Sequence, residues 1–420
     1  MSAVGTIESE QVTETGAASG WFPGLSTRLT ALFWALACLG TVMVASAAIG
    51  SADGPTEMRR VLVQRAAWMG IALVAFLVGR YIPYRMWRRH QLVILILTLG
   101  ILAAVLIPGI GTVVNGARRW IRMGPWIGFQ PSEFAKVGLI IWCAAYVERN
   151  AARMHRFVPG FLIPFGGAGS VSLLVLLEPD FGTAALIGTV AALLIVAFGS
   201  RLLYVTLAGM SMLPLVYHLV LGAPYRRERI MSFLHPWEDP LGSGYQLIQS
   251  MISVGSGGLM GRGLGLGVQK LGFLPDTPSD FIFALVSEEL GFVGAGTVVL
   301  LFLLIVWEGF RVVLRAEDRF GAALAFGIAC LFGIQGAIHI AVVTGSVPTT
   351  GMTLPLVSAG GSSLFVGMVA AGLLVNVAAR AEKPGNEKPT PWYKDTPFYE
   401  EWLHARVLDP LQCRLPGIRP

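Results

Sequence analysis

Long apolar runs separated by short polar segments constrain this chain more than any other feature of its sequence. They lie at approximately 29–50, 61–82, 91–108, 131–148, 158–177, 182–199, 202–222, 281–310, 320–345 and 362–380. About 20 consecutive apolar residues are enough to cross the hydrocarbon core of a bilayer. Only 13% of the 420 residues are charged, about half the share found in soluble domains. The sequence therefore predicts an all-α polytopic membrane protein with about ten transmembrane helices.

The first apolar run is interpreted as an uncleaved span rather than as a secretory signal. It is followed by Ala45-Ser46-Ala47, which has the small residues of a cleavage site. However, the 28 residues before it are polar and acidic, whereas a signal peptide begins with a basic region. The four cysteines show neither a disulfide framework nor metal-ligand spacing. The net charge of +6 would suit anionic lipid or nucleic acid, and the hydropathy favours lipid and no nucleic-acid partner.

The distribution of Lys and Arg predicts the orientation of the chain. An even number of spans places both termini on one side, together with the loops near 83–91, 149–157, 200–201 and 311–319. That side holds 18 basic residues, the opposite side holds 10, and three of the 31 lie within spans. Because basic residues concentrate in the cytoplasm, we expect cytoplasmic tails at 1–28 and 381–420. Between them lies a membrane domain at 29–380, with a large extracytoplasmic loop at 223–280.

The extracytoplasmic loops contain nearly all of the specific-looking polar residues, as expected if a site is built on that face. Five of these arginines are candidates to bind phosphate, because a guanidinium group matches phosphate oxygens in bidentate geometry. They are Arg118, Arg119, Arg226, Arg227 and Arg229. Ordinary anchoring at the lipid headgroups is the alternative for all five.

Glu133 and Lys136 lie three residues apart on one face of the expected fourth span, where they can pair. Ionisable groups at membrane depth are costly and are functional candidates, although a structural ion pair near a helix start explains them equally well. Ser362 and Ser363 open the tenth span. A helix N-terminus can hold an anion, and simple helix capping by serine is the alternative.

Asp280 begins the eighth span and is either its N-cap or a base at the water–lipid boundary. Partial desolvation would raise the pKa of such a carboxylate and make it a better base. Glu288 and Glu289 lie two turns deeper, and at least one is expected to face the bundle interior. Glu178 and Asp180 end another span, where helix-end solvation competes with a functional role.

The stretch 255–267 contains seven glycines but matches neither nucleotide-binding fingerprint. Small residues let backbones approach closely, so this stretch is interpreted as a close-packing or re-entrant segment. From the residues alone, a transporter and an enzyme acting on an anionic lipid-linked substrate remain equally open.

Taken in order, the loop motifs resemble those of the SEDS proteins (shape, elongation, division, sporulation), the family of the FtsW and RodA peptidoglycan polymerases. The resemblance covers approximately 29–380. It rests on Asn115-Gly-Ala-Arg-Arg-Trp, Gln130-Pro-Ser-Glu, Glu178-Pro-Asp-Phe-Gly-Thr, Gly242-Ser-Gly-Tyr-Gln, Asp280-Phe-Ile-Phe with Glu288-Glu-Leu-Gly, and Pro348-Thr-Thr-Gly.

This resemblance implies a glycosyltransferase of the inner membrane that polymerises lipid II on the outer face, with an undecaprenyl-pyrophosphate-linked glycan as donor. The family's essential aspartate falls on Asp280, the expected general base for an inverting attack. The substrate-binding candidates are Arg118, Arg119, Lys136, Glu133, Arg226, Arg227, Arg229, Glu289, Ser362 and Ser363. A divalent cation could assist the leaving pyrophosphate, but no metal ligands are assigned. Expected partners are a class B penicillin-binding protein and other divisome proteins.

The segment Gly267-Val-Gln-Lys-Leu-Gly-Phe-Leu lacks the extra residue that elongation-type members often carry, which favours an FtsW-like division role over a RodA-like one. The chain departs from the family pattern at Pro278-Ser279, where His-Thr is usual, and at Ala359, where an aromatic residue is usual. A lipid II flippase and a non-catalytic scaffold that recruits a transpeptidase are the alternative functions.

Overall fold

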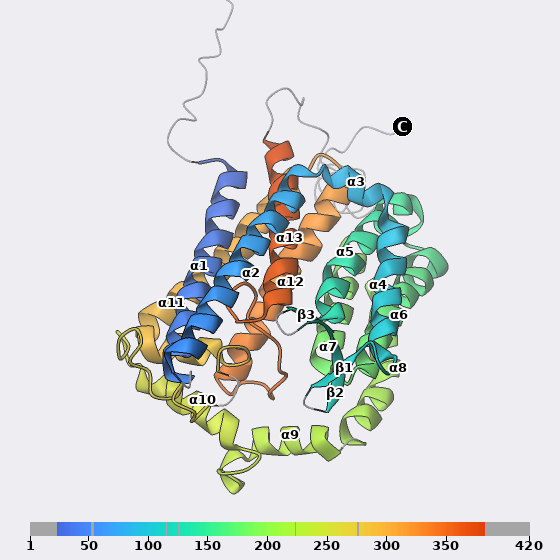
Figure 1. Ribbon diagram of the computed structural model, residues 1–420. Coiled ribbons are helices and arrows are strands. Elements are labelled where there is room, and N and C mark those ends of the chain that lie inside the picture. The colour runs from blue at the N-terminus through green and yellow to red at the C-terminus, as the bar shows by residue number, and fades with distance from the viewer. Residues whose placement is uncertain are drawn as a thin grey trace, which may run out of the picture.

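Figure 1 shows a computed structural model of the chain, which is a bundle of helices. The structure describes residues 23–51, 54–114, 116–124, 127–222, 224–274 and 277–382. The two tails expected at 1–28 and 381–420 therefore lie almost entirely outside the described residues.

Each of the ten expected apolar ranges contains a helix. These helices are α1 (Leu25–Ser51), α2 (Pro55–Tyr81), α4 (Gln91–Leu106), α5 (Pro131–Arg149), α6 (Ile163–Leu177, after a π-helical turn at Val158–Leu162), α7 (Phe181–Ala197), α8 (Leu202–Leu221), α11 (Ile282–Arg315), α12 (Arg319–Val343) and α13 (Gly361–Ala381). In the described parts of the chain, six helical segments are long and apolar enough to span a membrane, judged by length and composition. The all-α membrane class is confirmed, whereas the number of ten spans remains a prediction.

Shorter elements connect these helices. They are α3 (Tyr84–Arg89), α9 (Pro224–Leu234), α10 (Tyr245–Ser256) and 3-10 turns at Ala151–Arg153 and Pro236–Glu238. A small antiparallel sheet of β1 (Thr112–Val114), β2 (Ala117–Met123) and β3 (Ile127–Phe129) lies between α4 and α5. Its register pairs Thr112 with Trp120 and Ile121 with Phe129. The sequence analysis did not predict this sheet, because its strands are too short for a clear alternating pattern.

The first and last described helices meet at one end of the molecule. In Figure 1 the start of α1 and the end of α13 lie together at the top, whereas the sheet, α9 and α10 lie at the opposite end. The carboxylate of Glu382 accepts hydrogen bonds from the backbone N–H of Leu25 and from Ser26 Oγ. The start of α1 and the end of α13 are therefore joined at the same end of the molecule.

Close backbone contacts pack α13 against α2. A side-chain carbon added at Gly79 would lie 2.5 Å from the carbonyl oxygen of Val369, and one at Gly372 would lie 2.3 Å from that of Phe76. Without glycine at these two positions the helices could not approach so closely, which is the packing typical of small residues in membranes.

Helix α11 is interrupted near its start. Gly291 has φ 66° and ψ −163°, a conformation that favours glycine. The preceding segment, 282–290, packs against the glycine-rich stretch, where a side-chain carbon on Gly257 would lie 1.9 Å from the carbonyl oxygen of Ser287. The close-packing interpretation of 255–267 is confirmed, and the interruption divides the long apolar run at 281–310 into two helical segments.

Candidate active site

A cavity of about 350 Å³ lies at the end of the molecule that carries the sheet and α9 (Figure 1). Five segments form its wall: strand β2, the turn between α6 and α7, helix α9, helix α12, and the loop before α13. The lining residues are Arg119, Pro179, Asp180, Phe181, Gly182, Arg229, Ile230, Ile338, Val347, Pro348, Thr349 and Thr350. Three of the motifs singled out in the sequence therefore meet around one space.

Asp280 is half-buried beside this wall. A side-chain carbon built on Gly351 would lie 3.5 Å from Asp280 Oδ2, so the carboxylate packs against the residue that follows Thr350 in the cavity wall. The N-cap of α11 is Phe281 rather than Asp280. The alternative role of Asp280 as the N-cap residue is therefore wrong by one position.

Two arginines in the wall are held by backbone carbonyl groups. Arg119 donates from Nε to the oxygen of Glu178 at 2.9 Å and from Nη2 to that of Pro179 at 2.5 Å. Arg229 donates from Nη1 to the oxygen of Thr349 at 3.1 Å. Because backbone carbonyls carry no formal charge, these hydrogen bonds do not neutralise either guanidinium group, and a guanidinium group on this wall can bind an anion.

Glu178 is fully buried at the end of α6, and neither of its carboxylate oxygens has a hydrogen-bond partner. Burial and the nearby charge of Asp180 raise the pKa of Glu178 to about 8, although Arg119 acts in the opposite direction. Asp180 caps α7 by accepting from the N–H of Thr183 at 3.1 Å. Helix-end solvation is therefore the wrong explanation for Glu178, which is shielded from water.

A buried polar network anchors the loop that faces Asp280. The predicted ion pair is confirmed, with Lys136 Nζ 2.8 Å from Glu133 Oε2. Lys136 Nζ also donates to Gln335 Oε1 at 3.0 Å, and Gln335 Nε2 donates to the carbonyl oxygen of Thr353 at 2.9 Å. One helical turn further along α12, His339 Nδ1 bonds the carbonyl oxygen of Met352 at 2.8 Å. Helix α12 therefore holds the loop backbone directly, and α5 holds it through Gln335.

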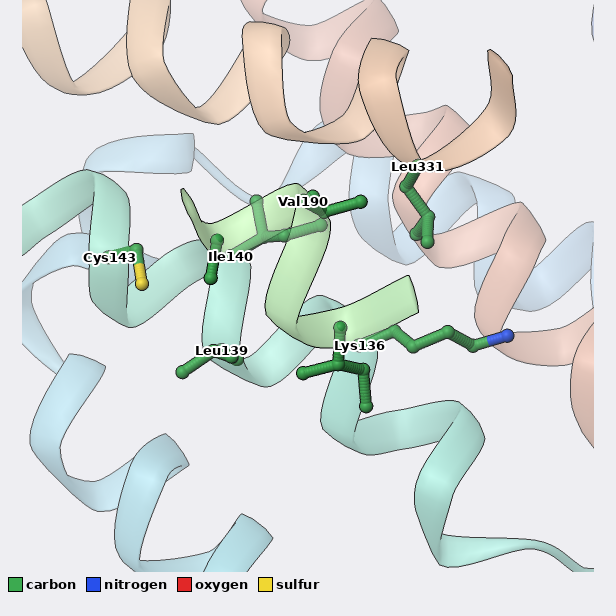
Figure 2. Close-up of a pocket in the computed structure, with 8 residues that line it drawn as sticks. Lys136, Leu139, Ile140, Cys143, Val190 and Leu331 are labelled. Carbon is green, nitrogen blue, oxygen red and sulfur yellow. The ribbon is translucent and has the colours of Figure 1, made fainter. Parts of the chain in front are cut away.

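Figure 2 shows how Lys136 lies relative to the interior of the bundle. Its aliphatic stem borders a small apolar pocket shared with Leu139, Ile140, Cys143, Val190 and Leu331, and its ammonium group points away from Cys143. The other residues that line this pocket supply no charged partner for the ammonium group. The charge is satisfied instead by Glu133 and Gln335 in the network described above.

Of the predicted site residues, only Arg119 and Arg229 are among the described residues that line the cavity. Arg118 is on the same strand as Arg119 but donates to the carbonyl oxygen of Leu106 at 3.2 Å, as expected for adjacent residues on opposite faces of a strand. Arg227 is exposed on α9, and the side chain of Arg226 lies outside the described residues. These three arginines remain candidates on sequence grounds alone.

Both serines are buried at the start of α13. Ser363 Oγ lies 3.1 Å from Thr353 Oγ1, whereas Ser362 Oγ has no partner. The N-cap residue is Gly360, which makes no side-chain cap, so the expectation of serine capping is not met.

Glu288 and Glu289 are both fully buried, which confirms that they face the protein interior. Lys270 Nζ lies 2.7 Å from Glu289 Oε1, and Ser46 Oγ donates to Glu289 Oε2 at 2.5 Å. The carboxylate of Glu289 is thus occupied by protein groups and does not reach the cavity wall.

The two departures from the SEDS pattern lie side by side. The N–H of Ala359 donates to the carbonyl oxygen of Pro278 at 2.9 Å, and Ser358 Oγ donates to that of Ser279 at 2.6 Å. These bonds use backbone oxygens and fix the segment before Asp280 to the loop before α13.

Sequence reasoning missed Gln335, His339 and Arg65. Each is a polar residue within an apolar run, which is the signal that identified Lys136. Arg65 is buried in α2 and donates to the carbonyl oxygens of Ser358 and Leu356 at 3.0 and 3.5 Å. Across the described ranges, no group of three or more His, Cys, Asp or Glu residues could hold a metal ion.

Comparison with known proteins gives consistent matches over the membrane region. The family model for cell cycle proteins of the FtsW, RodA and SpoVE type matches residues 27–383. A probable peptidoglycan glycosyltransferase FtsW of Geobacter sulfurreducens is 44% identical over 352 residues, covering 82% of this chain and 93% of that protein. Stage V sporulation protein E of Bacillus subtilis is 41% identical, covering 82% and 94%.

Solved structures share the fold. A chain of a peptidoglycan synthase complex that coordinates polymerization and crosslinking has a TM-score of 0.70 at 29% identity, covering 85% of this chain and 98% of that one. The rod shape determining protein RodA of Thermus thermophilus has a TM-score of 0.61 at 26% identity, covering 86% and 99%.

Proposed function

Because the chain belongs to the FtsW, RodA and SpoVE family of cell cycle proteins, we propose that it polymerises lipid II into the glycan strands of peptidoglycan. It is a multi-pass protein of the inner membrane with a role in building the cell wall. It is a peptidoglycan glycosyltransferase, the activity for which its FtsW relatives are named.

One observation carries the proposal most directly. Two arginines that donate hydrogen bonds to backbone carbonyl groups line the cavity, and Asp280 packs against Gly351, the residue that follows Thr350 of its wall. An enzyme that expels pyrophosphate needs fixed positive charge where the negative charge develops. It also needs a base close to the attacking hydroxyl group. The cavity wall offers the positive charge, and Asp280, which is outside the lining residues, packs against Gly351 next to that wall.

In the proposed reaction, the C4 hydroxyl of lipid II attacks the anomeric carbon of the glycan carried on undecaprenyl pyrophosphate. Asp280 takes the hydroxyl proton as the new carbon–oxygen bond forms with inversion. The bond to pyrophosphate breaks, and its electron pair leaves with the phosphate oxygen, next to Arg119 and Arg229. A divalent cation bound with the pyrophosphate would add positive charge, and no step here depends on it.

We also propose the septal role and the orientation expected from the sequence. The short form of the 267–274 segment supports division over elongation as the process served. The excess of basic residues supports cytoplasmic termini, which would place the cavity on the outer face of the membrane.

A single-span class B penicillin-binding protein is the proposed partner, together with other divisome proteins. The support is the fold shared with a chain of the peptidoglycan synthase complex. We expect such a transpeptidase to co-purify from native membranes in mild detergent. Its repeated absence under those conditions would count against the partnership.

Polymerisation by the purified chain, given pre-formed lipid II in detergent, separates the enzyme from its rivals. A flippase moves its substrate between two leaflets and makes no glycan in micelles. A non-catalytic scaffold makes none under any condition unless its partner is added. Glycan strands formed by the chain alone would support the proposal, and their absence from a stable preparation would contradict it.

A further inference from the structure

Residues 257–274, here called the glycine loop, present a row of apolar side chains to the outside of the bundle. The loop contains no Asp or Glu. Six of its large apolar side chains are between 49% and 78% exposed: Leu259, Met260, Leu264, Leu266, Leu271 and Phe273. In Figure 1 the loop lies beside the start of α11, at the edge of the molecule.

The backbone of the glycine loop is satisfied by the two buried glutamates of α11. Their carboxylate and carbonyl oxygens accept hydrogen bonds from the backbone N–H groups of Arg262, Gly263, Gly265, Gly267, Val268 and Gln269. In return, the N–H groups of Phe292 and Val293 donate to the carbonyl oxygens of Gly258 and Leu259. Irregular backbone is tolerated at membrane depth only where protein groups satisfy it, and this loop meets that condition.

The charges of the loop are also compensated. Lys270 is buried and paired with Glu289 at 2.7 Å. Arg262 lies 3.5 Å from Glu288, with 42% of its side chain exposed. A long arginine stem can run along apolar surface and place its charge at the headgroups. The loop can therefore enter an apolar phase without an unpaired buried charge.

The depth of the loop follows from its attachment to α11. Phe292 and Val293 are 71% and 54% exposed and continue the row of exposed apolar side chains along that helix. Charged residues begin at Glu308, near the other end of the helix. At the rise of an α-helix, Phe292 and Glu308 are about 24 Å apart along the helix axis. The hydrocarbon core of a bilayer is about 30 Å thick. The part of the loop bonded to these residues therefore lies within the hydrocarbon.

We propose that the glycine loop is inserted into the membrane leaflet on the Asp280 side, with its exposed apolar side chains in contact with lipid acyl chains. Glu288 and Glu289 are then the anchors of this insertion. The lipid contact is continuous with the exposed apolar face of α11, which identifies acyl chains as the occupant. The inference does not depend on which reaction the cavity performs.

Spin-label accessibility in lipid nanodiscs tests this proposal. Nitroxide labels are attached to Leu264→Cys and Leu266→Cys in a chain whose four native cysteines are replaced by Ala. The matched control is Leu241→Cys, since Leu241 is 88% exposed in the same large loop and lies near Asp239. Each variant is first compared with the unlabelled chain for its thermal unfolding temperature.

At positions 264 and 266 we expect access to molecular oxygen to exceed access to a water-soluble nickel complex, with the opposite ratio at 241. A high access to nickel at 264 and 266 would place the loop in water and overturn the proposal. Protection from both reagents would show contact with protein, such as a second chain, and would overturn it equally. As an independent measurement, Leu266→Asp is expected to lower the unfolding temperature in nanodiscs more than Leu241→Asp does.

Discussion

At the scale of single residues, the Asp280 carboxylate is the group whose loss should cost the most activity. Asp280→Asn keeps the size of the side chain and removes its ability to accept a proton. Since a positioned base typically contributes about 10²–10⁴-fold, we expect a loss of that size in the rate of glycan formation from labelled lipid II. The helix start should be unaffected, because Phe281 holds the N-cap position.

The matched variant is Glu289→Gln, which alters a buried carboxylate on the same helix, away from the cavity wall. Both variants are checked for thermal stability. Near-normal glycan strands from a stable Asp280→Asn protein would contradict the assignment of the base. Loss of polymerisation in Glu289→Gln alone would indicate that Glu289, and not Asp280, is the base.

The Glu133–Lys136 pair is a second residue-scale test. Lys136→Met and Glu133→Ala each leave an unpaired buried charge, which costs about 3–5 kcal/mol. Because Lys136 also holds Gln335 and through it the loop at Thr353, we expect polymerisation to fall more than the amount of protein in the membrane. Quantitative blotting of membranes beside the activity assay makes the comparison. If both variants vanish from the membrane, the pair is structural only.

Glu178 predicts a particular dependence of stability on pH. The raised pKa of about 8 means that the folded state keeps a proton that the unfolded state releases above its ordinary value of 4.5. The contribution of Glu178 to the free energy of unfolding, fully present at acidic pH, is therefore lost progressively as the pH rises from about 4.5 to about 8. Glu178→Gln should be close to wild type at pH 5 and more stable at pH 8.5. Thermal unfolding at the two pH values checks this, and an equal difference at both would contradict it.

The same scale shows what the sequence could and could not predict about the site. The Glu133–Lys136 pair followed from a spacing of three residues within one helix. The hydrogen bond from Lys136 to Gln335 joins residues 199 positions apart, and local spacing carries no information on such a contact. For the same reason the sequence offered five arginines for phosphate binding, and only the packing of β2 and α9 placed Arg119 and Arg229 around one cavity.

At the scale of elements, the interruption of α11 is open to a direct test. A side-chain carbon on Gly291 would lie 2.3 Å from the backbone nitrogen of Gly261, and the residue has a positive φ. Gly291→Ala should therefore lower the free energy of unfolding by about 3 kcal/mol, from strain and overpacking together. The control is Gly296→Ala on the same helix, where an added carbon meets nothing within 4 Å. Equal unfolding temperatures for both variants would show that the interruption is unimportant.

Hydropathy predicted where the helices lie, because each must present apolar side chains to lipid or to the bundle interior. It could not predict the three-stranded sheet, α9 or α10, whose sequences are polar or too short for a clear period. The interruption in α11 also could not be predicted from hydropathy. The carboxylates of Glu288 and Glu289 beside it are satisfied by a loop that precedes the helix in the sequence, and hydropathy carries no information on that contact.

At the scale of the whole molecule, orientation is the prediction on which the site depends. Both tails should be cytoplasmic, since 18 of the basic residues lie on their side and 10 on the other. A reporter enzyme that works only after export should be silent when fused after Pro420 and active when inserted beside Leu241. An active fusion at Pro420 would reverse the orientation and place the cavity in the cytoplasm.

Arg65 has a consequence for the time course of synthesis. Its guanidinium group is buried in the second helix, and its carbonyl partner Ser358 is made 293 residues later. At about 5–20 residues per second, the ribosome needs roughly 15–60 s to reach that partner. During this interval the carbonyl groups that accept its hydrogen bonds do not yet exist, and its described partner in the part already made is Thr41 Oγ1, at 3.4 Å from Arg65 Nε. A chain stopped before residue 356 would lack both carbonyl acceptors of Arg65, so this buried guanidinium group would lose the partners that only the finished chain supplies.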